Sequence, residues 1–175
     1  MKRILILLLL AALLLAGCSG KPGEESTAEP VSTEAAETQT PMVSLYDLRK
    51  AMLAAEPELP EMMAVSSSDE NADQLFTYLS EADYAKVEGY YLAYAADGSA
   101  YEIAVVCLRS AEDTAEMEAS LKTHVDGRVS LYKNYAPDQM EQAKTAKIVT
   151  RGRYVALVMC KAQDAVIRAF EDGVK

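Results

Sequence analysis

The dipeptide Asp97-Gly98 constrains the fold most, because it lies between two runs of strand-forming residues, 88–94 and 101–107. Asp-Gly is typical of a two-residue type I′ turn, in which both positions have positive φ. A hairpin on this turn pairs Tyr94 with Tyr101. Because side chains alternate across a strand, this register places five apolar side chains on one face. They are Tyr90, Leu92, Ile103, Val105 and Cys107.

Arg151-Gly152 gives a weaker turn signal between residues 145–150 and 153–160, and predicts a second hairpin. A two-residue loop there pairs Ile148 with Val155 on one face. Val149 and Tyr154 then face each other on the opposite side of the sheet.

Helical patterns surround the two hairpins. Ser44 is the expected N-cap of a first helix, which ends before Pro57, and residues 71–80 could hold a short helix. Ser110 is expected to start a long helix whose apolar stripe continues past Gly127 to Tyr132. A last helix is expected from 162 to 172, with Gly173 as the residue that follows it.

This order, α-ββ-α-ββ-α, predicts a single α+β domain with a four-stranded antiparallel sheet made of the two hairpins. We expect the helices to pack on one face. The other face would then be unusually apolar, and the first helix is favoured as its cover. The alternative is a surface that binds a partner. That possible binding surface comprises Tyr91, Tyr154, Val106 and Val158.

The N-terminal residues have the pattern of a secretory signal peptide, or leader. Lys2 and Arg3 precede an unbroken apolar run, 4–16, which is shorter than the roughly 20 residues of a membrane-spanning helix. The run ends in Leu15-Ala16-Gly17-Cys18, which resembles the lipobox of bacterial lipoprotein precursors. We therefore expect cleavage between Gly17 and Cys18 and a lipid on the Cys18 thiol. That lipid would hold the protein on the extracytoplasmic face of the cell membrane.

The expected organisation is a signal peptide at 1–17, a lipidated cysteine with a disordered acidic tether at 18–42, and the α+β extracytoplasmic domain at 43–175. The tether has no aromatic residue and is rich in Ser, Thr, Glu, Ala and Pro. The full chain has a net charge of −10, and removal of Lys2 and Arg3 with the signal makes it −12. Without a basic cluster after the leader, the chain is not expected to bind nucleic acid or to dock directly on anionic lipid.

Two further segments carry a resemblance. The runs Tyr132-Lys133-Asn134-Tyr135-Ala136-Pro137 and 152–158 (GRYVALV), together with the lipobox, resemble an uncharacterised lipoprotein family of Gram-positive bacteria. Its shared domain is described as a domain of unknown function. The resemblance extends from about residue 43 to the C-terminus. It implies a single domain outside the membrane of a Gram-positive cell, and it implies no catalytic or ligand-binding residue.

The chain offers few groups for chemistry. Cys107 and Cys160 are predicted on opposite faces of the sheet, so two buried thiols are favoured over a disulfide, although a one-residue slip of either register would reverse that argument. His124 is the only histidine, and no Cys-x-x-Cys pair accompanies it, so we expect a half-exposed helix residue. No metal and no cofactor are expected.

Three functions stay open. The favoured one is a non-catalytic binding or interaction module with an envelope protein as a possible partner. The alternatives are an envelope enzyme whose site no spacing reveals, and an accessory structural lipoprotein. A pocket with convergent polar groups would favour the enzyme, and a broad exposed apolar face would favour the binding module.

Overall fold

Five antiparallel strands form the sheet in the computed structural model, which describes residues 42–175. Their order across the sheet is β1-β2-β3-β5-β4. The two expected hairpins, β2–β3 and β4–β5, meet where β3 pairs with β5, and β1 extends the sheet along β2. The strands are β1 (Met62–Ser66), β2 (Val87–Ala95), β3 (Glu102–Leu108), β4 (Lys147–Arg151) and β5 (Tyr154–Met159).

Five α-helices accompany the sheet in this part of the chain. They are α1 (Leu45–Ala54), α2 (Ala72–Phe76), α3 (Thr114–Tyr135), α4 (Pro137–Lys144) and α5 (Gln163–Gly173). Short 3₁₀ turns at Tyr84–Lys86 and Ala111–Asp113 precede β2 and α3. The prediction of four strands was therefore wrong by one, since the five-residue β1 was not expected. Apart from β1 and α4, the elements follow the expected order.

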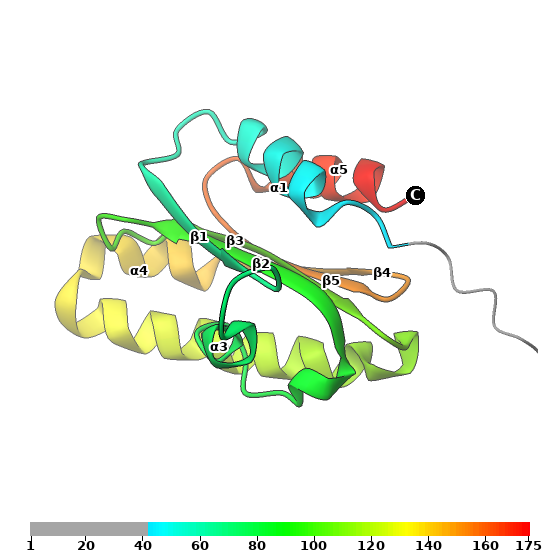
Figure 1. The fold of residues 1–175 in the computed structure, drawn as a ribbon. Coiled ribbons are helices and arrows are strands. Elements are labelled where there is room, and N and C mark those ends of the chain that lie inside the picture. Colours follow the sequence, from blue (N-terminus) through cyan, green and yellow to red (C-terminus); the bar gives the residue numbers. More distant parts are fainter. Residues whose placement is uncertain (1–41) are drawn as a thin grey trace, which may run out of the picture. The chain divides into compact units, whose positions relative to one another are not determined.

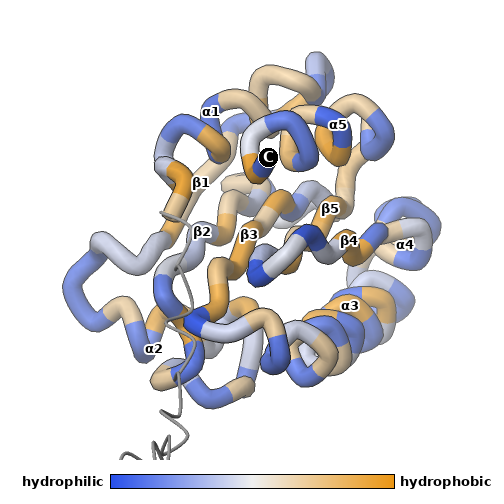
Figure 2. The backbone as a smooth tube through the Cα atoms, turned by 90° about the vertical axis from the view of Figure 1, so that its right-hand side faces the viewer, coloured by the Kyte–Doolittle hydropathy of each residue, from blue (hydrophilic) through white to orange (hydrophobic). Residues whose placement is uncertain are grey.

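Helices cover both faces of the sheet, so the expected one-sided packing was wrong. Figure 1 shows α1 and α5 above the sheet and α3 and α4 below it, and Figure 2 shows the same layers from the side. On the α1–α5 face, Leu48 and Met52 pack with Tyr91, Val105 and Phe170. The favoured alternative for the apolar face, a cover by the first helix, is confirmed, and α5 shares that role.

The register of the first hairpin differs from the prediction by one residue. Tyr94 pairs with Glu102 instead of Tyr101, because the Ala95 backbone N–H donates to the Tyr101 carbonyl and the loop between these two residues contains five residues, 96–100. Gly98 does adopt the positive φ that Asp-Gly indicates, at 78°. A shift of one residue moves every side chain of one strand to the other face relative to its partner. Tyr90 and Leu92 therefore share a face with Ala104, Val106 and Leu108.

The second hairpin is shifted by two residues, which preserves the predicted faces. Ile148 pairs with Leu157 instead of Val155, because the turn lies at 152–153 rather than 151–152. An even shift leaves each side chain on its expected side.

The helix signals were read more accurately than the turns. The Ser44 hydroxyl accepts the Asp47 backbone N–H at the start of α1, as an N-cap should. The long helix α3 continues through Gly127. It ends at Tyr135, and Pro137 then occupies the first turn of α4, a helix that was not expected from the sequence.

Cys107 and Cys160 are free and buried, as favoured, but the reason was wrong. Both lie on the α1–α5 face. Cys107 pairs with Tyr154, six residues before Cys160 along the same strand direction. At about 3.3 Å per residue, the two thiols lie on the order of 20 Å apart.

The leader, the Gly17–Cys18 cleavage site and nearly all of the tether lie outside the described residues. None of the helices in 42–175 is both long and apolar enough to cross a membrane.

Candidate functional site

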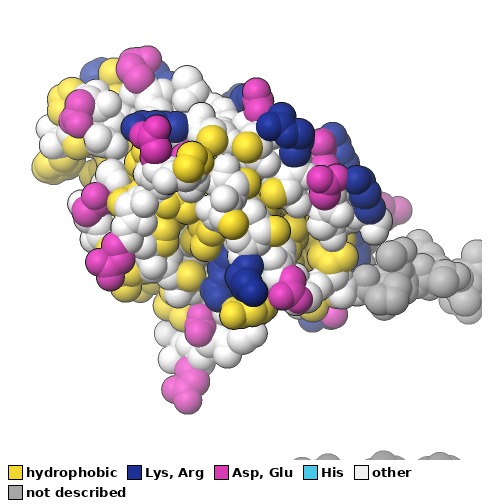
Figure 3. All heavy atoms as spheres, turned by 90° about the horizontal axis from the view of Figure 1, so that it is seen from above, with side chains coloured by type: hydrophobic (Ala, Val, Ile, Leu, Met, Phe, Trp, Pro, Cys, Tyr) yellow, Lys and Arg dark blue, Asp and Glu magenta, His cyan; other side chains and the backbone are white. Residues whose placement is uncertain are grey.

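The four residues of the expected binding surface do not form an exposed platform. Tyr91, Tyr154 and Val158 are buried beneath α1 and α5, and Val106 is buried on the opposite face of the sheet. Figure 3 views the α1–α5 side and shows acidic and basic side chains interspersed around hydrophobic ones, with neither charge gathered into one patch. The sheet itself is therefore closed to a partner on both faces, and a candidate site has to lie elsewhere.

A groove of about 590 Å³ lies between α3 and the segment 77–82 that follows α2. Its volume is in the range of small-molecule sites, roughly 300–1,000 Å³. Most of the lining side chains are polar, and several carry hydroxyl groups. The lining is Thr77, Tyr78, Leu79, Ser80, Glu81, Ala82, Glu116, Ser120, Thr123, His124, Gly127 and Arg128.

A buried carboxylate holds two of the α3 side chains that line this groove, His124 and Arg128, in position. Glu102, at the start of β3, is 3% exposed and points toward α3. Its Oε2 accepts the His124 Nε2–H over 2.6 Å, and its Oε1 lies 2.5 Å from Arg128 Nε. Residues 124 and 128 are four apart on the helix, so one strand carboxylate reaches both. The bond at Nε2 leaves Nδ1 as the other polar atom of the imidazole.

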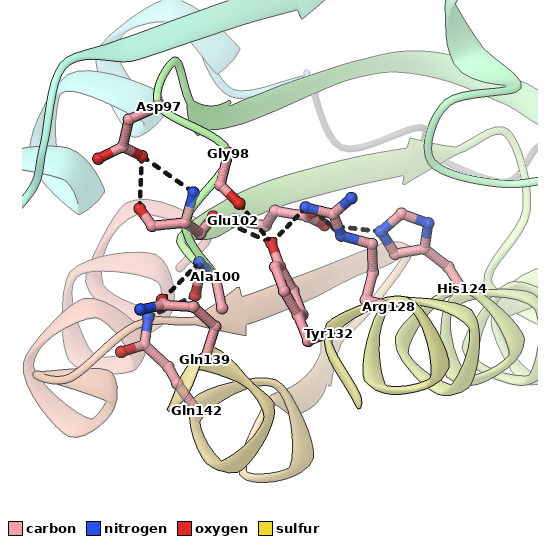
Figure 4. A network of polar contacts seen from close by, with 10 residues as sticks. Asp97, Gly98, Ala100, Glu102, His124, Arg128, Tyr132, Gln139 and Gln142 are labelled. Carbon is pink, nitrogen blue, oxygen red and sulfur yellow. Dashed lines mark hydrogen bonds and ion pairs between the residues drawn. The ribbon is translucent and has the colours of Figure 1, made fainter. Parts of the chain in front are cut away.

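The network continues from Arg128 into the β2–β3 loop (Figure 4). An Arg128 terminal N–H donates to the Tyr132 hydroxyl over 2.6 Å, and this hydroxyl donates to the Ser99 carbonyl over 3.0 Å. Burial raises the pKa of Tyr132 against the opposing effect of Arg128, so the hydroxyl keeps its proton and remains a donor. The loop conformation that sets the β2–β3 register is thus linked through Tyr132 to Arg128, which also lines the groove.

Helix α4 holds the same loop from its other side. Gln139 Oε1 accepts the Ala100 backbone N–H over 3.1 Å, and Gln142 donates to the Ala100 carbonyl. These bonds satisfy the backbone N–H and C=O of Ala100, a residue that a two-residue turn would have placed in the strand ladder. The five-residue loop is therefore stabilised by α3 and α4, which explains why the local turn signal alone gave the wrong register.

A pair of serines fixes the opposite wall of the groove. Ser80 is buried, and its hydroxyl lies 2.7 Å from the Ser120 hydroxyl on α3. The same Ser80 oxygen accepts the Ala82 backbone N–H over 3.1 Å. The segment that follows α2 is consequently attached to α3, and the groove has two walls that the chain itself positions.

Gly127 leaves the α3 backbone open along the groove. Apart from its chain neighbours and the adjacent helix backbone, a Cβ atom built there has no heavy atom within 4 Å, and the residue has the negative φ of an ordinary helix. No packing or backbone requirement within residues 42–175 therefore explains a glycine in the interior of α3. Its consequence is that a bound molecule could approach the helix backbone closely.

The charges of the groove nearly cancel. Arg128 is paired with Glu102, and Glu116 accepts from Lys86 over 2.6 Å. These pairs leave Glu81, which makes no hydrogen bond or ion pair to the described residues. The groove can therefore donate and accept hydrogen bonds without presenting the excess positive charge that an anionic ligand would need.

The sequence itself carries a signal for this arrangement. His124, Arg128 and Tyr132 recur every four residues, which places three polar-headed side chains on one line of the helix. Glu102 is the single charged residue of an otherwise apolar strand. His124 was expected to be a half-exposed helix residue, but its side chain is only 15% exposed. Its pairing with Glu102 could have been inferred only by placing β3 against α3.

One protein family matches the chain. The family described as a domain of unknown function (DUF4358) matches residues 59–160, which include the groove and the whole Glu102 network. Neither a curated protein nor a solved structure matches the chain significantly.

Proposed function

The chain belongs to the DUF4358 family of domains of unknown function, and from this premise we propose that it is a lipid-anchored extracytoplasmic protein. In this proposal its domain is a non-catalytic binding module of the cell envelope. The binding site is the groove between α3 and residues 77–82, and not the sheet face considered from the sequence. The leader favours a bacterial lipoprotein, and the acidic tether and the family resemblance favour a Gram-positive envelope.

The anchor rests on the order of features at the N-terminus. A basic start, a short apolar run, Ala16-Gly17 and Cys18 follow one another with the spacing of a lipoprotein signal. Two acyl chains on the cysteine would give stable attachment, because each buried methylene contributes about 0.8 kcal/mol. The acidic tether and the net charge of −12 would keep the domain away from anionic headgroups.

The observation that carries the binding proposal is the preorganised groove. Glu102 holds His124 and Arg128 in place, and the Ser80–Ser120 contact fixes the other wall. Side chains whose positions are set before binding lose less conformational entropy when a ligand arrives. Gly127 keeps the space between these walls free of a side chain.

An envelope hydrolase is the second candidate, and one contact favours it. The Glu102–His124 pair resembles the orienting half of a catalytic triad, and Ser120 lies one helical turn from His124. However, the Ser120 hydroxyl contacts Ser80 at 2.7 Å, and no bond joins it to His124 in the described residues. If the site were hydrolytic, Ser120→Ala would abolish turnover and leave binding intact, whereas a binding module would show no turnover in either protein.

Anchoring is tested by replacing Cys18 with alanine in cells. The unchanged protein and a Ser19→Ala control should incorporate a labelled fatty acid, sediment with membranes and be degraded by protease added to intact protoplasts. Cys18→Ala should lose the label and accumulate as the uncleaved precursor. Label incorporation and normal processing in Cys18→Ala would refute the lipid anchor.

Binding at the groove is tested by a photo-crosslinking residue at position 123, whose side chain is exposed on the groove. The matched control is the same residue at Lys133, which is exposed on α3 outside the groove. Irradiation of intact cells should give a product at position 123 only, and Gly127→Leu should remove it. Equal products at both positions, or none at position 123, would refute a binding site in the groove.

A further inference from the structure

We propose that the ligand of the groove is an uncharged carbohydrate, specifically a stretch of the glycan strands of the cell wall, with one sugar ring stacked on Tyr78. This inference rests on the binding function proposed above and adds the chemical class of the ligand. Four properties of the groove support it: its charge balance, its hydroxyl and planar polar groups, its exposed aromatic ring, and the open backbone at Gly127.

The charge balance favours a neutral ligand. The one cation that faces the groove, Arg128, is neutralised by Glu102 at 2.5 Å, and Glu81 leaves an acidic excess. The whole domain is acidic as well, so phosphates, sulfates and anionic lipid headgroups are repelled over distances of about 10 Å. A polar ligand without charge meets no such barrier.

The hydrogen-bonding groups match those that hydroxyl-rich molecules need. Sugar hydroxyls donate and accept at once, and they are bound in pairs by planar side chains such as carboxylate, guanidinium and imidazole. Glu81, Arg128 and His124 supply these three types along one groove. The hydroxyls of Thr77 and Thr123 donate to carbonyls of their own helices, which leaves their lone pairs as acceptors.

Tyr78 supplies the aromatic surface. Its side chain is 60% exposed, and it makes no ring contact or hydrogen bond with its side chain within the described residues. An exposed ring at the rim of a polar groove can cover the C–H face of a pyranose ring, which is the apolar side of a sugar. The rings of two nearby tyrosines, Tyr84 and Tyr90, instead pack against Phe76, and neither lines the groove.

Gly127 makes room for a ring against the helix. Because the site of its missing Cβ is open, a flat molecule can lie along α3 between Thr123 and Arg128. A glycine here lowers helix stability by about 1 kcal/mol relative to alanine without any compensating contact inside the domain. Close approach of a ligand to the backbone accounts for that cost.

The cell wall is the source to which we assign this carbohydrate. In the anchored protein proposed above, the tether expected at 18–42 would span about 25–30 Å if it behaves as a coil of roughly 25 residues, which would place the domain within reach of the wall. Glycan strands of repeating pyranose rings would occupy an open groove from end to end, whereas an enclosed pocket would admit only a chain terminus.

The test uses the full lipidated chain in a detergent without a sugar headgroup. The probes are chitotetraose, a neutral chain of four N-acetylglucosamine units, and insoluble purified peptidoglycan. We expect saturable chitotetraose binding by calorimetry and co-sedimentation with peptidoglycan. Tyr78→Ala should weaken chitotetraose binding about five- to tenfold, the size of one aromatic contact, and Gly127→Leu should reduce it below detection.

Two matched variants control for general effects. Tyr135→Ala removes another exposed tyrosine, which lies outside the groove, and Ala119→Leu adds a leucine at an exposed site on α3 that does not line the groove. Both should bind like the unchanged protein. Circular dichroism and thermal unfolding establish that Gly127→Leu is folded. Absence of binding to both probes, or binding that Gly127→Leu leaves intact, would overturn the carbohydrate assignment.

The outcomes separate this inference from the function on which it rests. If neither probe binds but position 123 still crosslinks to a non-carbohydrate partner in cells in a Gly127-dependent manner, the carbohydrate assignment fails and the binding module stands. If position 123 gives no product and neither probe binds, both proposals fail.

Discussion

Replacement of Gly127 by alanine should stabilise the domain. The residue lies in the interior of α3, eight residues before the helix ends at Tyr135. An added methyl group would have no heavy atom within 4 Å apart from its chain neighbours and the adjacent helix backbone, so it creates no clash and loses no contact. The change therefore isolates the backbone cost of a helical glycine.

The expected magnitude follows from helix propensity. Alanine is favoured over glycine in a helix interior by about 0.8–1.0 kcal/mol, chiefly because glycine has more conformational freedom to lose on folding. In a domain of this size, about 1 kcal/mol corresponds to a rise in Tm of roughly 3–5 °C. The methyl group is too small to fill the groove, so ligand binding should fall much less than in Gly127→Leu.

Urea and thermal unfolding measure this effect, and Gly173→Ala is the matched control. Gly173 also lies in a helix, but a Cβ there would be 2.5 Å from Leu48 Cδ1 on the buried α1–α5 face. Gly173→Ala should therefore destabilise the domain, by about 1–2 kcal/mol. If Gly127→Ala also lowered the free energy of unfolding, glycine would be required by the fold, and the argument that the groove is kept open for a ligand would be refuted.

Three further perturbations follow from buried groups. Glu102→Ala should lower the free energy of unfolding by about 2–3 kcal/mol, less than the 3–5 kcal/mol of a fully buried ion pair because Arg128 is partly exposed. Burial disfavours the Glu56 carboxylate, but hydrogen bonds, chiefly from the Ala162 and Glu58 backbone N–H groups, hold its pKa below the ordinary 4.5. The contribution of the ionised Glu56 carboxylate to the free energy of unfolding should therefore be complete above pH 4.5 and be lost as the pH falls. The free energies of unfolding of Glu56→Gln and the unchanged protein should consequently converge in acid. Burial raises the pKa of Cys107, and burial with the neighbouring Glu56 raises that of Cys160 to about 12, so mass spectrometry should find neither thiol alkylated at pH 8 until urea is added.

One result in each of these three experiments would contradict its prediction. A Glu102→Ala effect no larger than that of Glu58→Ala, which removes an exposed ion pair with Lys161, would mean that the buried network adds little. If the difference in free energy of unfolding between Glu56→Gln and the unchanged protein grew in acid, the Glu56 pKa would be raised by folding and not lowered. Alkylation of Cys107 or Cys160 at the rate of a small thiol would show that the α1–α5 face opens readily.

The sequence predicted the regular elements better than their pairing. Ser44, the stripe on α3 and the apolar runs of β2, β3 and β5 each signal an element locally, through capping or periodicity. The β2–β3 register was wrong because the loop at 96–100 is held by Tyr132, Gln139 and Gln142, which are distant in sequence. β1 spans only five residues, so its strand pattern is too short to be recognised next to Pro60.

The candidate site was less predictable than the fold. Its wall residues come from α3 and from the irregular segment 77–82, whose proximity depends on how the helices pack on the sheet. The buried Glu102 became meaningful only once β3 was placed against His124 and Arg128. Conversely, Tyr91 and Val106 were considered as a possible binding surface because a four-stranded sheet with helices on one side leaves one face uncovered. In the structure, helices cover both faces of the sheet.

The most direct test of the account is a map of ligand contacts on the domain by amide NMR. Chitotetraose added to isotopically labelled full-length protein should shift the signals of residues 77–82 and 123–128, with smaller changes at Glu102, and Gly127→Leu should remove these shifts. Signals that move on β4 or on the α1–α5 face instead, or that do not move at all at saturating probe, would contradict the claim that this groove is the binding site.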